Sequence, residues 1–107
     1  MTGESDRRIG VVGIVIEDRA IAPKVNEILS AHGEIIVGRM GIPYRERGVF
    51  VISLIVDGTT DEIGAMTGKL GNLARVRVKT ALASRSAMGV GGGAAGVRGG
   101  FREGGKP

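Results

Sequence analysis

RIGVVGIVI at residues 8–16 and VFVISLIV at residues 49–56 are the two segments from which the architecture of this chain follows. β-branched residues dominate both segments, and in neither of them is one alternating set of positions polar. A strand with this pattern is buried on both faces, because each alternating set avoids water. We therefore expect both segments at the centre of a sheet.

The segment after the first of these strands is expected to be a helix. Asp18 is placed to cap its start, and Pro23 is tolerated in its first turn, where the amides lack partners within the helix. Gly33 is placed to end it in a left-handed conformation. Its apolar stripe has helical spacing and consists of Ile21, Val25, Ile28, Leu29 and His32.

A second helix is expected after the second apolar strand. Thr59 and Glu62 have the spacing of a capping box, with Thr59 as the N-cap residue and Glu62 at the third helical position. Gly71 and Asn72 are expected to end this helix. The residues that it buries are predicted to be Ile63, Met66 and Leu70.

The remaining segments complete the pattern. Residues 34–42 predict a less apolar strand, residues 43–48 predict a turn, and residues 75–82 predict a strand with one charged face. The order βαββαβ is typical of an α+β, ferredoxin-like fold: an antiparallel sheet of order 4-1-3-2 with two helices on one face. That order places the two apolar strands at the centre and the charged strand at an edge, where charge opposes pairing with another sheet. The charged residues are Arg75, Arg77 and Lys79.

The helices of such a fold cover only one face of the sheet, so the other face of the central strands is left apolar. An apolar patch of this kind usually marks an interface, and burying ~500 Å² of it contributes on the order of 12 kcal/mol before the costs of association. We therefore expect a homodimer or a higher homo-oligomer. Depending on the register, the uncovered set is either Val11, Val15, Val51 and Ile55, or Val12, Ile14, Ile16, Phe50, Ile52, Leu54 and Val56.

The chain of 107 residues is expected to hold one domain, at residues 8–83. A flexible segment at residues 1–7 precedes it, and a disordered, Gly-rich basic tail at residues 84–107 follows it. Of the formal net charge of +4, +3 lies in this tail, so the domain itself does not require a basic binding face. Residues 98–102, RGGFR, resemble one unit of an Arg-Gly-rich RNA-binding segment, and the alternative is a solubilising extension.

Several classes of protein are disfavoured by composition. The sequence has no Cys and a single His, His32, so we expect no metal site and no cofactor. Neither a catalytic triad nor paired carboxylates nor a phosphate-binding loop has its spacing here, so we expect no enzyme. The apolar runs are shorter than the roughly 20 residues of a membrane span, and the N-terminal segment carries acids instead of the basic start of a signal peptide. We therefore expect a cytoplasmic protein without membrane contact.

Nucleic-acid binding by the domain is also disfavoured. The order βαββαβ occurs in the RNA recognition motif, where aromatic side chains on the third strand stack on bases. Val49 and Val51 occupy those positions here, and Phe50 between them points to the opposite face. The residues before the first strand are too few for a DNA-binding helix, so no direct DNA binding is expected.

A family resemblance adds to this interpretation. The segments at residues 38–46 (GRMGIPYRE) and 61–71 (DEIGAMTGKLG), followed by VRVK at residues 76–79, resemble the family of iron-only hydrogenase system regulators, which are small ACT-like bacterial proteins. The resemblance extends over residues 8–82 and, more distantly, to ACT regulatory domains and the C-terminal domain of nickel-responsive repressors. It implies a regulator whose oligomers bind small effectors near their interfaces.

Two groups of residues are candidates for binding such an effector. The first surrounds the predicted turn, where guanidinium groups can hold a carboxylate or a phosphate by paired hydrogen bonds, unless the group is only an exposed turn. It consists of Arg39, Tyr44, Arg45 and Arg47. The second lies on the second helix, where glycines permit close approach of a ligand, of the sheet or of a partner chain. It consists of Gly64, Gly68 and Lys69.

The sequence as a whole therefore predicts a non-catalytic, homo-oligomeric regulatory module of the ACT-like type. We expect it to be linked to the iron-only hydrogenase system and to act through a small anionic effector or a protein partner. The alternative is a structural scaffold that binds protein and takes no small ligand.

Overall fold

A computed structural model describes residues 7–83 of the chain, so the predicted tail at residues 84–107 and residues 1–6 of the predicted flexible N-terminal segment lie outside the described residues. The strands are β1 (Arg7–Ile16), β2 (Ile36–Tyr44), β3 (Val49–Thr59) and β4 (Val76–Leu82). The helices are α1 (Ala22–Ala31) and α2 (Thr60–Gly71), and short 3-10 turns lie at η2 (Arg19–Ile21), η3 (Gly33–Ile35) and η4 (Arg45–Arg47).

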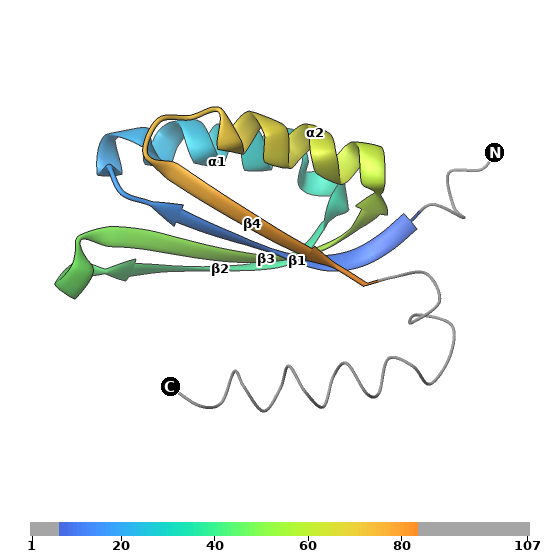
Figure 1. Cartoon of the computed structure of the whole chain (residues 1–107), viewed down its shortest axis with the longest axis horizontal. Helices are drawn as coiled ribbons and strands as arrows, with labels where there is room; N and C mark the ends of the chain where they lie inside the picture. The colour runs from blue at the N-terminus through green and yellow to red at the C-terminus, as the bar shows by residue number, and fades with distance from the viewer. Residues whose placement is uncertain (1–6, 84–107) are drawn as a thin grey trace, which may run out of the picture.

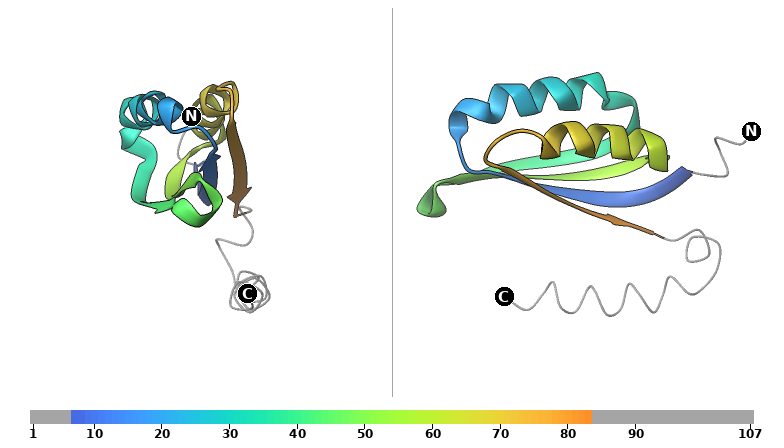
Figure 2. Two further views of the ribbon diagram at one scale, coloured as in Figure 1. Left: turned by 90° about the vertical axis from the view of Figure 1, so that its left-hand side faces the viewer. Right: turned by 45° about the horizontal axis from the view of Figure 1, so that its top comes forward.

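The strands form one antiparallel sheet of order β2-β3-β1-β4, which is the predicted order 4-1-3-2. Both helices lie on the same face of the sheet, as Figures 1 and 2 show from three directions. The predicted α+β, ferredoxin-like fold is confirmed. The apolar strands β1 and β3 are the central pair, and the charged strand β4 is at an edge.

The register of β1 against β3 determines which side chains the helices cover. Val12 lies opposite Leu54 and Ile14 opposite Ile52, and these four side chains are at most 1% exposed. The alternating set is left on the other face, where Val11 lies opposite Ile55 and both are 49% exposed. The helices complete the core with Val25, Leu29, Ile63, Met66 and Leu70.

Several predicted boundaries are wrong at the start and end of α1. Asp18 caps the 3-10 turn η2, where its carboxylate accepts a hydrogen bond from the N–H of Ala20 at 3.0 Å, and the N-cap residue of α1 is Ile21, which provides no side-chain cap. Pro23 does lie in the first turn of α1. Gly33 is not left-handed, because the chain continues directly into η3, in which the N–H of Ile35 donates to the carbonyl of His32.

The hairpin between β2 and β3 is longer than predicted. β2 begins at Ile36 and continues through Pro43 to Tyr44, and Pro43 pairs with Phe50. An edge strand accepts Pro because it needs no N–H on its open side. The turn is limited to η4 and to Gly48, whose φ of +69° is the left-handed conformation that glycine favours.

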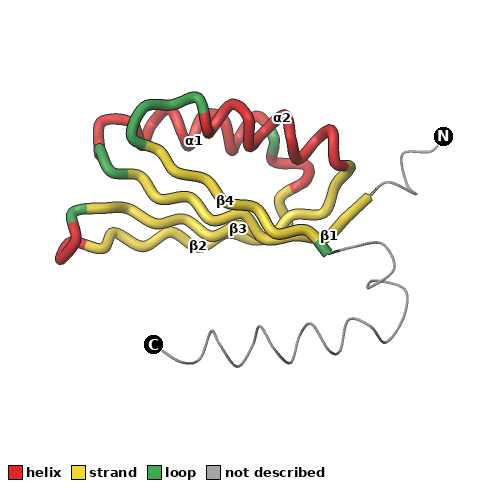
Figure 3. The backbone as a smooth tube through the Cα atoms, in the orientation of Figure 1, coloured by secondary structure: helices red, strands yellow, loops and turns green. Residues whose placement is uncertain are grey.

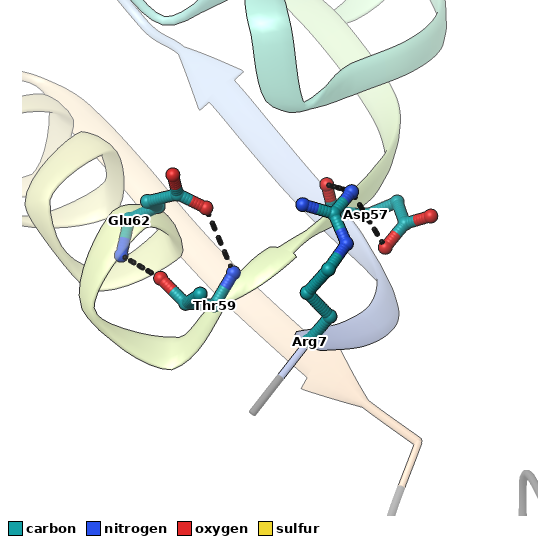
Figure 4. Close-up of polar contacts among 4 residues, drawn as sticks. All are labelled: Arg7, Asp57, Thr59 and Glu62. Carbon is teal, nitrogen blue, oxygen red and sulfur yellow. Dashed lines mark hydrogen bonds and ion pairs between the residues drawn. The ribbon is translucent and has the colours of Figure 1, made fainter. Parts of the chain in front are cut away.

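Two strand ends also differ by one residue. Arg7, which we assigned to the flexible segment, is the first residue of β1. Its guanidinium donates to the carbonyl oxygen of Asp57 at 3.1 Å and lies 3.2 Å from the carboxylate of the same residue (Figure 4). Arg75, assigned to the fourth strand, precedes β4 with a φ of +65°. This left-handed conformation costs a non-glycine residue about 1–2 kcal/mol.

The predicted capping box at the start of α2 is confirmed. The hydroxyl of Thr59 accepts from the N–H of Glu62 at 3.0 Å, and the carboxylate of Glu62 accepts from the N–H of Thr59 at 2.9 Å (Figure 4). This backbone hydrogen bond holds the pKa of Glu62 below its ordinary value, and the positive charge of Arg7 acts in the same direction.

Replacing Thr59→Ala removes the acceptor for the N–H of Glu62 and is expected to lower the free energy of unfolding by about 1 kcal/mol. For a domain of this size this is a fall in Tm of about 4–8 °C, measurable by circular dichroism. The adjacent exposed residue gives a matched control, because Thr60→Ala leaves the capping box intact. Equal effects of the two changes would contradict a role for the box.

A second prediction concerns the contact of β1 with β4. A Cβ at Gly10 would lie 2.5 Å from Cδ2 of Leu82 and 2.7 Å from the carbonyl oxygen of Ala81, so Gly10→Ala is expected to destabilise the fold by about 1–3 kcal/mol. The control is Gly41→Ala, where the new Cβ would meet the Phe50 ring at an ordinary 3.5 Å. Denaturant titration of both variants tests the difference, and a Gly10→Ala variant as stable as the control would contradict it.

Candidate functional site

The predicted cluster of arginines at the hairpin is divided by the sheet. Arg39 pairs with the buried Leu54, so it lies on the helix-covered face, and its Nη2 donates to Oδ1 of Asn26 on α1 at 3.0 Å. Tyr44 pairs with Val49 on the other face and is 45% exposed. Arg39 and Tyr44 therefore do not contribute to one site on a single chain.

Arg45 belongs to a cavity that the sequence analysis did not predict. The ribbon of β2 and β3 reaches beyond the helices at its turn (Figure 3). On the helix side of this extension, the ribbon and the start of α1 enclose about 700 Å³, which we call the hairpin cavity. Cavities of about 300–1,000 Å³ are typical of small-ligand sites. It is lined by Arg19, Ala22, Pro23, Pro43, Arg45, Gly48, Val49 and Phe50.

The lining of the hairpin cavity is apolar with two basic groups and no acid. Neither Arg19 nor Arg45 forms an ion pair with any residue between 7 and 83. The acids on the adjoining segment have other contacts: Glu17 binds Arg77 at 2.8 Å, and Asp18 caps η2. The lining therefore has two positive charges and no negative one, although Glu46 adjoins Arg45 in η4, and it offers guanidinium groups and apolar walls for contact with a ligand.

The predicted cluster on α2 has a different environment from the one expected. Within residues 7–83, a Cβ at Gly64 or at Gly68 would meet no atom within 4 Å outside its own helix turn, and both residues are exposed, so these glycines do not pack closely against the sheet. Lys69, on the same helix, lies with its Nζ 3.3 Å from Nε2 of His32, which is half-buried at the end of α1. A ligand role for Gly64, Gly68 and Lys69 stays a prediction.

Two kinds of feature are absent from the described part of the chain. Residues 7–83 contain no group of three or more His, Asp and Glu side chains close enough to share a metal ion. Neither helix in this range is both long enough and apolar enough to span a bilayer.

The sequence gives only part of the signal for the hairpin cavity. Arg45 was identified because Arg clusters near a Pro-containing turn, but Arg19 lies 26 residues earlier in the chain and approaches the cavity only through the fold. Phe50 and Pro43 were assigned to a strand and a turn, respectively. Their pairing across β2 and β3 brings both into one wall.

Fold and surface together define a small ferredoxin-like module with an uncovered apolar sheet face and a basic cavity at one end. The family model for TM1266-like proteins, described as "Iron-only hydrogenase system regulator, putative", matches residues 8–80. The chain belongs to this family. The description assigns a regulatory role to the family.

A solved structure of 42% identity supports this assignment. The chain is 42% identical to TM1266 from Thermotoga maritima, with a TM-score of 0.69 over 73% of this chain and 99% of that one. A protein from Galdieria sulphuraria shares the fold at 18% identity, with a TM-score of 0.55 over 73% of this chain and 46% of that one. A nitrogen regulatory PII-like protein from Thiomonas intermedia K12 is 17% identical, with a TM-score of 0.46 over 74% and 93%. No curated protein matches the sequence.

The open surroundings of the α2 glycines lead to a prediction. Gly64→Ala and Gly68→Ala are each expected to raise the free energy of unfolding by about 1 kcal/mol, because alanine orders more readily in a helix and its methyl group has open space among residues 7–83. Gly48→Ala is the contrasting variant, since its left-handed backbone disfavours a side chain and stability should fall. Thermal unfolding measures all three, and a loss of stability in the α2 variants would show that another chain or ligand packs against this helix.

Proposed function

We propose that this protein is a cytoplasmic, non-catalytic regulatory module of the iron-only hydrogenase system that functions as a homo-oligomer. Its subunits associate through the uncovered face of the sheet, and it acts through a small effector or a protein partner. The observation that carries the proposal is the apolar character of that face in a member of a family described as regulators.

The uncovered face has apolar side chains on three neighbouring strands. Val11 on β1 lies opposite Ile55 on β3, and Val51 on β3 lies between Val15 on β1 and Ile42 on β2. Contiguous apolar surface is rare on monomeric proteins and usually marks a site of interaction. The exposed members of this face are Ile9, Val11, Met40, Ile42 and Ile55, which are between 48% and 60% exposed.

A second copy of the chain is a suitable cover for this face. In a two-fold symmetric dimer the same patch of both subunits forms the interface, so the apolar face of one chain is covered by the apolar face of the other. The neighbouring edge strand carries Lys79 opposite Gly13 and Arg77 opposite Val15. Charge at this edge limits the apolar area to one side and provides the polar rim that protein interfaces commonly have.

A scaffold that binds only protein remains the second candidate function, because the same face suits a different protein chain. The two candidates differ in their ligands: a regulatory module binds an effector, and its Tm then rises with ligand concentration. A scaffold has no such response to small molecules.

The assembly is tested with the full chain by light scattering coupled to size-exclusion chromatography. The wild-type protein at micromolar concentration is expected to have the mass of a dimer or a larger assembly. Ile55→Lys places a charge at the centre of the face and is expected to yield monomers. Because Ile55 is 49% exposed in the single chain, the fold should tolerate the lysine.

The matched control is Ala65→Lys, which places the same charge at an exposed position of α2, on the other side of the molecule. This variant should keep the wild-type mass. A monomeric wild-type chain, or an Ile55→Lys variant that retains the full assembly, would contradict the proposal.

A further inference from the structure

We propose that the hairpin cavity binds a small organic anion with a flat apolar body, such as an aromatic carboxylate or phosphate ester. The inference deepens the proposed function, since it rests on that function for the need of an effector, but the binding itself requires one chain only. It follows from the shape, the lining and the charge of the cavity.

The two walls of the cavity come from segments that are distant in the sequence. One wall is the extended ribbon, with Pro43 and Phe50 paired across its two strands, and the other is the start of α1, with Ala22 and Pro23. Rings of Phe and Pro are rigid, so they offer preformed apolar surfaces that lose little entropy when a ligand binds. Flat apolar groups fit between such walls.

Each wall also carries one guanidinium group. Arg19 belongs to the side of α1 and Arg45 to the side of the ribbon, and no acid lines the space between the walls. Guanidinium groups form paired hydrogen bonds with carboxylates and phosphates, and such charge-assisted bonds are stronger where water is partly excluded. The cavity therefore selects a negative charge on its ligand.

The N-terminal end of α1 also favours a negatively charged ligand in the cavity. Ile21 provides no side-chain cap for this helix, the N–H of Ala22 donates to the carbonyl of Arg19, and Pro23 has no N–H, so this end contributes through the helix dipole. The N-terminal end of a helix carries a partial positive charge. This contribution adds to that of Arg19 on the same wall and opposes the binding of cations.

The position of the cavity connects it to the proposed interface. Phe50 lines the cavity, and its neighbour Val51 lies on the uncovered face, where it pairs with Val15 and Ile42. A ligand that moves Phe50 therefore moves residues of the assembly surface, because one two-stranded ribbon carries both. Binding of an effector in the cavity can therefore change how the subunits associate.

The experiment uses the ¹⁵N-labelled full chain and NMR titration with phenylacetate and phenyl phosphate. At least one of these anions is expected to shift the amide resonances of Gly48 and Phe50 in a saturable manner, without comparable shifts at Val11. Phenylacetamide, the uncharged analogue of phenylacetate, is expected to bind at least tenfold more weakly than the anion that binds. Failure of both anions at millimolar concentration, or equal binding of the amide, overturns the proposal.

The variants test the two arginines separately from the rest of the turn. Arg19→Gln and Arg45→Gln keep the side-chain length and hydrogen-bonding ability but remove the charge, so each is expected to weaken binding of the anion severalfold and both together at least tenfold. Arg47→Gln changes the same 3-10 turn outside the cavity lining and should leave affinity unchanged. Equal losses in all three variants, or no loss in the double variant, overturn the assignment of the cavity.

The monomeric Ile55→Lys variant separates this proposal from the proposed function. It should still bind the anion in a saturable manner, because Ile55 lies on the uncovered face and does not line the cavity. Binding by a wild-type chain that is itself monomeric would support the cavity and reject the assembly. Assembly without binding of either anion gives the opposite result.

Discussion

The antiparallel pairing of β1 with β3 is the constraint on which the rest of the structure depends. Both strands are apolar on both faces, so alternation of polar and apolar residues does not by itself select the covered face. The two faces of this strand pair differ in the size of their apolar side chains and in whether the apolar pairs follow one another without a break. Gly13 pairs with Ser53 in the middle of the uncovered face, whereas the helix-covered face has the unbroken pairs Val12 with Leu54 and Ile14 with Ile52. The helices pack against the face that offers more apolar volume.

The same pairing explains why the fold was predictable and the cavity was not. Strand order follows from which segments are apolar throughout, and the capping box follows from Thr59 and Glu62, which are three residues apart; both signals are local. Where β2 ends depends on its position at the edge of the sheet. Pro43 fits into this strand only because β2 has no neighbouring strand on its outer side. The longer ribbon brings Arg45 to the cavity that Arg19 also lines. Because the length of the ribbon was not predicted, the sequence did not indicate that these two residues share a cavity.

The alternation of side chains along β2 also explains why the predicted cluster at the hairpin does not form one site. Arg39 and Tyr44 are five positions apart, so they point to opposite faces of a strand. Their closeness in the sequence suggested a single site, but in the structure Arg39 lies on the helix-covered face and Tyr44 on the uncovered face. For α2 the reverse holds: the glycine spacing predicts one helix face correctly, but whether the sheet or solvent faces it depends on Ile63, Met66 and Leu70, which bury the other face.

The hairpin ribbon carries the proposed binding cavity and part of the proposed assembly face, because its turn reaches beyond the helices (Figure 3). Elsewhere in the sheet, the core side chains of α1 and α2 hold the central strands from one side, and a shift of one strand would disturb many contacts. Phe50 still packs against the edge of this core, whereas the turn at η4 beyond it is exposed, so the position of the turn costs less free energy to change. A ligand that binds one position of the ribbon better than another shifts the population toward it. The end of the sheet that is least constrained by the core is therefore also the part best placed to transmit binding to assembly.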